Sequence, residues 1–374
     1  MERILATYRI AAPESESRAR AEALATEQSV EMPLAAITDE RILRDVVASV
    51  ESIRPHADYF DVVIGIAPST TGNEVSQLAN MLFGNCSLQP EVELVEVRFP
   101  AGYASAFPGP RFGIEGLRDL TGARGRALTC AILKPQGSPV EHFAQLAGTY
   151  AMAGVDVIKD DHGVANQAEH PFDRRVPAVQ RAVDEANRAT GGSTVYAPTF
   201  SGGPRALATQ ARIARDAGVR MALVAPMLVG LPVFLEMQED LGVPVMAHPA
   251  FAGAQRIAPP VLLGTLFRLL GADAIVFPNH GGRFGYSRAT CLAIADSARG
   301  ALEGARPALP VPAGGMSLDR VDEMLSDYGI DTMLLIGGGL LAAREALSQR
   351  TREFVERVRR AGHPQDRGAV ESGG

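Results

Sequence analysis

The strongest constraint on the fold is a regular alternation of short apolar runs and longer amphipathic segments from about residue 125 onward. The intervening segments have the apolar spacing of helices and often end in glycine, a frequent helix C-cap. Eight strands, each followed by a helical or connecting segment, predict a (β/α)8 barrel. An open, doubly wound sheet is the alternative, but no Gly-x-Gly-x-x-Gly follows the first strand. The runs predicted to be strands are 127–134, 155–161, 194–200, 219–226, 243–249, 272–278, 309–315 and 331–339.

The residues before the barrel follow a different pattern. Strand-like runs at 2–12, 58–68 and 92–100 are separated by helix-like segments at 14–29 and 75–84. This mixture predicts a small α+β domain of the ferredoxin-like kind. We therefore expect an N-terminal domain at 1–115, the barrel at 116–355 and a polar C-terminal tail at 356–374.

Composition argues against several classes of partner. The net charge is −7, and the chain has no basic tract and no tryptophan, which argues against nucleic acid. No apolar run reaches the ~18–20 residues of a membrane helix, and the first residues do not read as a signal peptide. The three cysteines lie far apart in the sequence, which disfavours a disulfide or zinc framework. We expect a cytoplasmic protein that binds a small molecule.

Ionisable side chains gather where the expected strands end, which is where barrels of this kind carry their active sites. Because side chains alternate along a strand, Lys159 and Asp161 should face the barrel axis, while Asp160 points outward. The residues that follow the strands are Lys134 after the first, Lys159, Asp161 and His162 after the second, His248 after the fifth and Arg283 after the sixth. The other histidines, His56, His142, His170 and His363, are expected at the surface or at helix caps.

Three roles fit a lysine at the position of Lys159. It forms a local ion pair with Asp161, although such a pair adds little stability when buried. It loses its proton and forms a Schiff base with a carbonyl substrate. Alternatively, it reacts with carbon dioxide to give a carbamate, a hard oxygen ligand that binds Mg²⁺ together with Asp161 and one more group. A metal held there polarises a substrate carbonyl.

Glycines follow the last two expected strands. Gly314 and Gly315 come after the seventh strand, and Gly337 and Gly338 come after the eighth. Backbone N–H groups at these two places form the usual phosphate site of the fold, so the glycines predict a phosphate-binding end of the substrate. The alternative is that they only allow tight turns.

Taken together, these motifs resemble Rubisco, the ribulose-bisphosphate carboxylase large chain, and most of all the Rubisco-like proteins (form IV) that do not fix carbon dioxide. The motifs are FPGPRFGIEGLRD before the barrel, the KP, GVDVIKDD and AGG motifs at strand ends, and a triple glycine after the last strand. The resemblance implies a carbamate on Lys159, a metal ligand at Asp161, and active-site roles for Lys134 and His248. It also implies a homodimer whose site lies between subunits, with Glu27 lent by the partner subunit.

Departures from the Rubisco pattern suggest different chemistry. His162 stands where the family has its third metal ligand, a glutamate, and imidazole suits Mn²⁺ better than Mg²⁺. His162 is therefore either a ligand or an acid/base group. Gln136 and Pro249 replace a lysine used with carbon dioxide and an arginine of the second phosphate site. The mobile-loop lysine is missing, although Arg283 lies nearby. These changes predict a substrate with one phosphate and argue against carboxylation.

Several reactions start from the enediolate that the family shares. We prefer decarboxylation or cleavage of a 3-oxo sugar-acid phosphate, in which Arg283 holds the leaving carboxylate. The alternatives are an isomerase of the 5-methylthioribulose 1-phosphate type and a tautomerase acting on a diketo sugar phosphate, which His162 disfavours. An isomerase needs a second acid/base, for which Lys134, His162, His248 and His280 are candidates. A non-catalytic barrel that binds a sugar phosphate is the remaining alternative.

Overall fold

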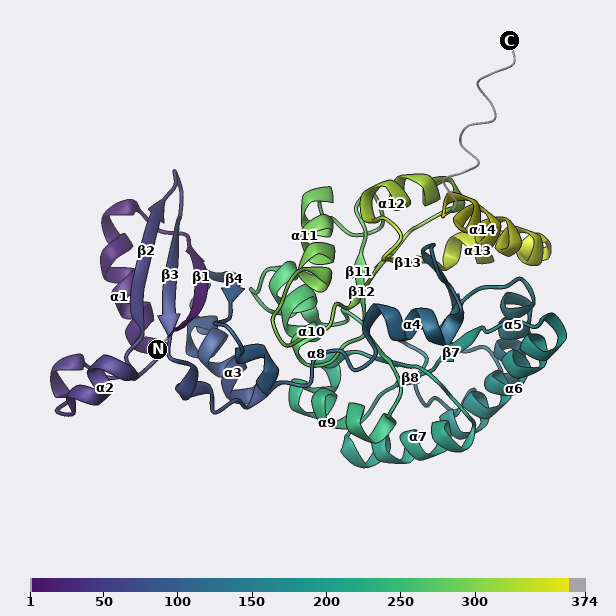
Figure 1. The fold of residues 1–374 in the computed structure, drawn as a ribbon, viewed down its shortest axis with the longest axis horizontal. Helices are drawn as coiled ribbons and strands as arrows, with labels where there is room; N and C mark the ends of the chain where they lie inside the picture. Colours follow the sequence, from purple (N-terminus) through teal and green to yellow (C-terminus); the bar gives the residue numbers. More distant parts are fainter. Residues whose placement is uncertain (1, 363–374) are drawn as a thin grey trace, which may run out of the picture.

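The computed structural model describes residues 2–362 and contains two domains (Figure 1). The N-terminal domain is an antiparallel sheet in the order β2-β3-β1-β4. Two helices follow β1, the second of them short, and one follows β3, so with this strand order the domain has the expected ferredoxin-like arrangement. Its elements are β1 (Ile4–Ile10), α1 (Ser17–Glu27), α2 (Glu40–Asp45), β2 (Ser49–Pro55), β3 (Phe60–Ile66), α3 (Val75–Phe83) and β4 (Val92–Arg98).

Alternating burial explains why this sheet forms. In β1 the side chains of Ile4, Ala6, Tyr8 and Ile10 are buried beneath the helices, as the period of two along a strand requires. The buried Tyr8 hydroxyl donates a hydrogen bond to the Leu82 carbonyl on α3, at 2.6 Å, which satisfies its polar group inside the core.

The second domain is the predicted barrel, and all eight expected runs contain a strand. The third run is divided at Pro198 into two short strands, β7 and β8. Hydrogen bonds join the strands in the orders β13-β5-β6-β7 and β8-β9-β10-β11-β12, all parallel. The strands are β5 (Leu128–Leu133), β6 (Val157–Asp160), β7 (Val195–Ala197), β8 (Thr199–Phe200), β9 (Ala222–Val224), β10 (Val245–Ala247), β11 (Ala274–Pro278), β12 (Leu309–Ala313) and β13 (Met333–Ile336).

Prolines explain why β12 and β13 are neighbours without a hydrogen-bonded ladder. The Leu309 N–H donates to Asp273 beside β11, so in a parallel strand the alternate residues face β13. Those residues are Pro310 and Pro312, which have no N–H to donate. The Thr332 hydroxyl instead donates to the Pro310 carbonyl, at 3.0 Å.

Helices surround the barrel, and α4 (Gly113–Thr121) covers one end of it (Figure 1). Ile114 and Leu117 of α4 join the buried residues of the barrel interior, which closes the end away from the strand C-termini. The other helices are α5 (Val140–Met152), α6 (Phe172–Thr190), α7 (Pro204–Asp216), α8 (Pro226–Val229), α9 (Leu231–Leu241), a π-helix (Pro260–Leu266), α10 (Phe267–Leu269), α11 (Arg288–Arg299), α12 (Val321–Tyr328), α13 (Gly338–Leu341) and α14 (Leu347–Ala361).

The last helix crosses the expected boundary at residue 355, since α14 continues to Ala361. Residues 363–374 of the expected tail, including His363, lie outside the described residues. Between residues 2 and 362, no helix is both long and apolar enough to cross a membrane.

Candidate active site

A cavity of about 420 Å³ lies at the C-terminal ends of the barrel strands. It collects most of the residues that the sequence singled out, although they come from different strands. Its lysine, arginine, aspartate and histidine lining residues are Lys134, Lys159, Asp161, His162, His248 and Arg283, and Gly314 lines it too. The expected convergence of strand-end side chains is therefore present.

Lys159 is the most deeply buried cation of the cavity. It ends β6 with only 2 % of its surface exposed, and its Nζ donates to the Asp160 carbonyl at 2.7 Å. Burial disfavours the charged form, so the pKa of Lys159 is lowered from its ordinary value. A lysine in this state has a larger neutral fraction, which is the form that attacks carbon dioxide or a carbonyl.

Asp161 is the centre of the polar contacts. Its carboxylate pairs with Lys134 and accepts hydrogen bonds from His162 Nδ1 at 2.9 Å and from the Gly163 N–H at 3.1 Å. Burial alone would raise the pKa of Asp161, but these hydrogen bonds outweigh it and hold that pKa well below its usual range. Asp161 is thus a carboxylate at neutral pH. Its cationic partner is Lys134, so the local Lys159–Asp161 ion pair that the sequence allowed is not formed.

The two site histidines are stacked on each other. The rings of His162 and His248 lie 4.2 Å apart with an angle of 14° between their planes. Burial, together with the nearby charges of Lys159 and His162, lowers the pKa of His248 to about 2. Its Nδ1 accepts from the Ala250 N–H at 3.1 Å, so in the neutral ring Nε2 carries the proton. His248 is therefore a neutral hydrogen-bond donor, whereas His162 is 48 % exposed.

Asp160 faces away from the cavity, as expected, and anchors a buried network. Its carboxylate accepts from Arg175 at 3.2 Å, from the Tyr196 hydroxyl at 2.8 Å and from the Thr199 N–H at 3.0 Å. Arg175 also donates to the carbonyls of Ala165 and His170, at 2.7 and 2.6 Å. This fully buried arginine therefore holds the loop that carries His162.

His170 corrects a prediction, because it is fully buried rather than at the surface. Its Nε2 accepts a hydrogen bond from the Gly137 N–H at 3.3 Å, and its ring packs edge-on against Phe143. Gly137 belongs to the loop after Lys134, whereas His170 belongs to the loop after His162. His170 thus joins the two loops that supply the partners of Asp161, and no sequence period marks a loop histidine of this kind.

The glycines after β12 have the conformations that the turn requires. Gly314 and Gly315 have φ of +86° and +88°, a region that favours glycine. A Cβ on Gly282 would lie 1.9 Å from the Gly314 carbonyl oxygen, so two loops approach each other closely here. Gly314 lines the cavity, whereas Gly315, Gly337 and Gly338 lie outside its lining. Their part in phosphate binding stays a prediction.

Two other candidates lie apart from the cavity of their own chain. Glu27 ends α1 in the N-terminal domain, where Asn85 donates to it at 2.9 Å, so a role in catalysis requires another subunit. His280 turns toward α12 and bonds to Asp327 at 2.9 Å, so it is not among the residues lining the cavity.

Aromatic residues that the sequence did not reveal also line the cavity. Phe251 and Phe284 are 61 % and 53 % exposed, and both line it together with Pro249, Ala250 and Tyr286. Phe251 has a φ of +68°, an uncommon conformation for a side chain of this size. The cavity therefore combines charged groups with exposed aromatic rings, and the two meet where the Arg283 guanidinium lies over the Phe284 ring, 5.6 Å from its centre.

The charged groups fit a carbamate and a divalent metal. Lys159 Nζ is a buried amine with a lowered pKa, and Asp161 is an ionised carboxylate in the same cavity. A carbamate oxygen and a carboxylate oxygen suit Mg²⁺ or Mn²⁺, and His162 adds an imidazole beside Asp161. The donors present are thus chemically suited to such an ion.

Comparison with known proteins agrees with this site. Residues 113–241 match the family model of the ribulose bisphosphate carboxylase large chain, catalytic domain. The chain is 52 % identical to ribulose bisphosphate carboxylase-like protein 1 of Rhodopseudomonas palustris, over 96 % of this chain and 98 % of that one. It is 50 % identical to the 5-methylthioribulose-1-phosphate isomerase of Rhodospirillum rubrum, over 96 % of both. A crystal structure of a Rubisco-like protein from Rhodopseudomonas palustris superimposes with a TM-score of 0.90 at 48 % identity, over 97 % of this chain and 99 % of that one.

A barrel with its reactive groups at the strand ends and a ferredoxin-like domain in front of it defines a class of small-molecule enzymes. Within that class, the chain belongs to the Rubisco large-chain family, among the Rubisco-like proteins. The resemblance noted from the sequence motifs is thereby confirmed.

Proposed function

We propose that this protein is a metal-assisted isomerase of a sugar monophosphate with an apolar far end, of the 5-methylthioribulose 1-phosphate type. The half-identical relative that carries this activity in its name supports the alternative, and not the decarboxylation that we preferred from the sequence. That relative also speaks against a non-catalytic binding protein. We place the enzyme in the cytoplasm.

The observation that carries the proposal is the mixed lining of the cavity, in which cationic groups and aromatic rings are both present. Gly314 and Arg283 offer a backbone N–H and a cation for a phosphate, and Phe251, Phe284 and Tyr286 give the same cavity an aromatic wall. A methylthio group is apolar and polarisable, and sulfur packs favourably against aromatic rings. A second phosphate or a carboxylate would gain nothing from these rings, and its desolvation would require a further cation beside the one that binds the first phosphate.

Lys159 as a carbamate and Asp161 would hold a divalent metal, Mg²⁺ or Mn²⁺, and His162 would then serve as an acid/base group. Such an ion supplies Lewis-acid polarisation of the substrate carbonyl, which acidifies the neighbouring C–H. His248, neutral and protonated on Nε2, donates a hydrogen bond to a substrate oxygen. Isomerisation also needs one group that removes a proton and one that returns it at the next carbon. Lys134 and His162, which approach Asp161 from different loops, are suited to these two steps.

We further propose a homodimer in which the partner subunit's N-terminal domain completes the site. Glu27 is not among the residues lining the cavity of its own chain. The segment after it exposes the apolar side chains of Met32 and Leu34, at 40 % and 42 %. Exposed apolar side chains next to a candidate site residue suit a subunit interface.

The test is turnover followed by proton and phosphorus NMR. The protein with Mg²⁺ or Mn²⁺ and bicarbonate should convert 5-methylthioribulose 1-phosphate into an isomer that keeps every carbon and the phosphate. It should neither carboxylate ribulose 1,5-bisphosphate nor release carbon dioxide from a 3-oxo sugar-acid phosphate. If the protein released carbon dioxide from the 3-oxo sugar-acid phosphate and did not isomerise 5-methylthioribulose 1-phosphate, the proposal would be wrong and decarboxylation would be the better assignment.

A further inference from the structure

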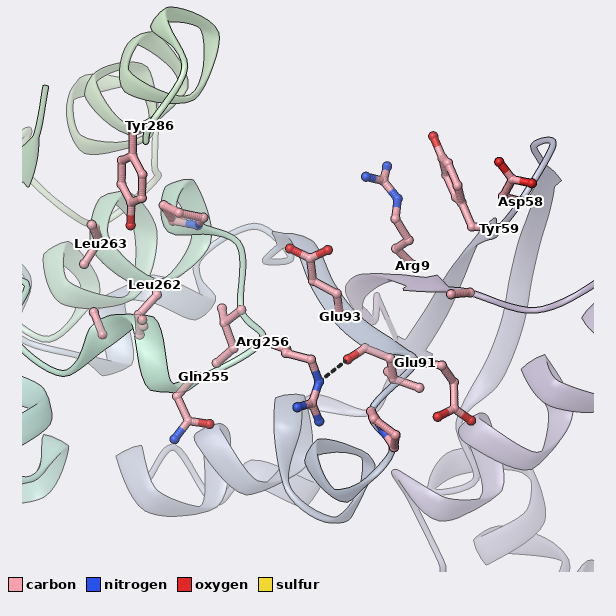
Figure 2. Close-up of a pocket in the computed structure, with 17 residues that line it drawn as sticks. Arg9, Asp58, Tyr59, Glu91, Glu93, Gln255, Arg256, Leu262, Leu263 and Tyr286 are labelled. Carbon is pink, nitrogen blue, oxygen red and sulfur yellow. Dashed lines mark hydrogen bonds between the residues drawn. The ribbon is translucent and has the colours of Figure 1, made fainter. Parts of the chain in front are cut away.

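A second cavity adjoins the active site. It measures about 630 Å³ and lies in the cleft between the two domains (Figure 2). Arg9 and Tyr59 stand on the N-terminal side of this cleft, and Tyr286 and Leu263 stand on the barrel side. Gly253 and Tyr286 line both this cleft and the substrate cavity, so a thin wall separates the two spaces.

Most of that wall is one stretch of chain, residues 249–258, which we call the wall segment. Pro249, Ala250 and Phe251 line the substrate cavity, whereas Gln255 and Arg256 line the cleft. Between them lies only a single short turn of 3-10 helix at Ala252–Ala254. The segment has little regular structure of its own, so its shape depends on what holds its two ends.

The barrel holds the first end. The His248 N–H, just before the wall segment, donates to the Val224 carbonyl at 2.7 Å. This bond continues the ladder between β10 and β9.

The N-terminal domain holds the second end. Arg256 donates through Nε to the Val92 carbonyl at 3.1 Å, the bond that is dashed in Figure 2. Its Nη2 donates to the carbonyls of Gln89, at 3.1 Å, and Ser87. The backbone joins in, because the Leu94 N–H donates to the Arg256 carbonyl at 3.0 Å and the Ala258 N–H donates to the Leu94 carbonyl at 2.8 Å. The wall segment therefore runs as a short parallel neighbour of β4.

The attachment of the wall segment to the N-terminal domain matters because it helps to fix the backbone of Phe251, which lines the substrate cavity. A phenylalanine at positive φ is held in an unfavourable backbone conformation, and it stays there only if the surrounding chain is fixed. Much of its ring is exposed toward the cavity rim, so packing around the ring cannot supply the whole restraint. Local backbone bonds close the turn, from the Ala252 N–H to the Pro249 carbonyl at 3.0 Å and from the Ala254 N–H to the Phe251 carbonyl at 3.2 Å. The side-chain hydrogen bonds of Arg256 add the restraint that ties this turn to the N-terminal domain.

We propose that Arg256 is a positioning residue through which the N-terminal domain holds the aromatic wall, and so sets the preference for an apolar group at the far end of the substrate. The identity of that group rests on the proposed function. The structural coupling itself depends only on the contacts of Arg256 and β4. A planar guanidinium can reach three carbonyls at once, which a shorter or uncharged side chain cannot do.

The test compares Arg256→Met with wild type and with Arg3→Met. Arg3 is a matched control because it also donates to three backbone carbonyls, those of Val47, Gly65 and Arg44, all inside the N-terminal domain. Calorimetry would measure binding of two unreactive pentitol 1-phosphates, one with a methylthio group at carbon 5 and one with hydrogen there. Hydrogen exchange would report the amides of residues 250–255.

In wild type, burying the methylthio group should favour the first compound by about tenfold. In Arg256→Met the ratio of the two affinities should fall to about twofold, because the loosened aromatic wall no longer packs against the methylthio group. The rate of amide hydrogen exchange at residues 250–255 should rise by about tenfold or more. Arg3→Met should keep the wild-type ratio and exchange. An unchanged ratio in Arg256→Met, or a wild type without any preference, would overturn the inference. Turnover assays judge the proposed function separately, since these analogues do not react.

Discussion

At the scale of single residues, Lys159 is central to the proposed chemistry. Its amine is buried, its pKa is lowered, and it shares a cavity with an ionised Asp161. Replacing it with methionine keeps much of the volume in an apolar setting, which the fold should tolerate.

We therefore expect Lys159→Met to melt within a few degrees of wild type but to lose activity by about a thousandfold or more. Wild type should be stabilised when bicarbonate and Mn²⁺ are added together, and the variant should not respond, as measured by thermal shift. If Lys159→Met were stabilised by bicarbonate and Mn²⁺ as much as wild type, a carbamate on Lys159 would be ruled out. Borohydride trapping of substrate on Lys159 would replace it with a Schiff base.

The sequence was most informative at this scale for residues at strand ends. Lys134, Lys159, Asp161, His162 and His248 share one cavity, as expected, because strand period and the barrel rule bring such positions together. Phe251, Phe284 and His170 were not foreseen. They lie in loops, where no periodicity indicates which way a side chain turns.

At the scale of elements, His170 joins the two loops that carry Lys134 and His162. His170→Met removes the acceptor for the Gly137 N–H, while His170→Gln offers an oxygen near the same place. We expect kcat to fall roughly ten- to a hundredfold in the methionine variant, because the loops lose their relative position, and to recover most of the way in the glutamine variant. Steady-state kinetics decides this, and equal kcat values in both variants would contradict a positioning role.

A second inter-element contact joins the loop after β11 to α12. The Asp327 carboxylate accepts hydrogen bonds from His280 Nε2 at 2.9 Å and from Arg288 Nε and Nη2 at 2.9 and 2.5 Å. Burial opposes ionisation, but these hydrogen bonds outweigh it, and the pKa of Asp327 is lowered. A lowered carboxyl pKa stabilises the fold above the unfolded value of about 3.9, and this stabilisation disappears as the pH falls through the folded value.

Asp327→Asn should therefore cost about 1 kcal/mol in the free energy of unfolding at pH 7, and the difference from wild type should shrink below about pH 4. Urea unfolding at fixed protein concentration measures it. Asp216→Asn, at an exposed position on α7, is the control for removing one carboxylate, and its difference from wild type is the background for the Asp327 result. A difference that is constant with pH would contradict the assignment.

Which segments form strands and helices was largely predictable from the sequence, whereas strand breaks and the pairing between neighbouring strands were not. All eight barrel runs contain strands, but the third breaks at Pro198 and β12 lacks a ladder to β13, because prolines remove the donors. The connection between β4 and the wall segment was not predictable, because it joins residues more than 150 positions apart through backbone groups that every residue has.

At the scale of the whole molecule, the proposal of a shared site makes a quantitative prediction. Glu27→Ala and Lys159→Met should each be inactive as pure proteins. When their chains are mixed by refolding or co-expression, half of the dimers contain one of each chain, and one of the two sites in each is intact. Activity should then recover to about a quarter of wild type.

Affinity-tagged chains allow the mixed dimers to be isolated and assayed. Two Lys159→Met chains carrying different tags are the control and should stay inactive. A mixture without activity would show that Glu27 does not act across a subunit interface.

The central claim is proton transfer on a sugar monophosphate without loss of carbon. The most direct measurement is turnover of 5-methylthioribulose 1-phosphate in D₂O with Mn²⁺ and bicarbonate, read by proton NMR. We predict an isomeric product with deuterium at the carbon that gains the proton and with an unchanged number of carbons, and we predict no exchange with Lys159→Met. Turnover with no solvent deuterium, or with release of a carboxyl carbon, would contradict it.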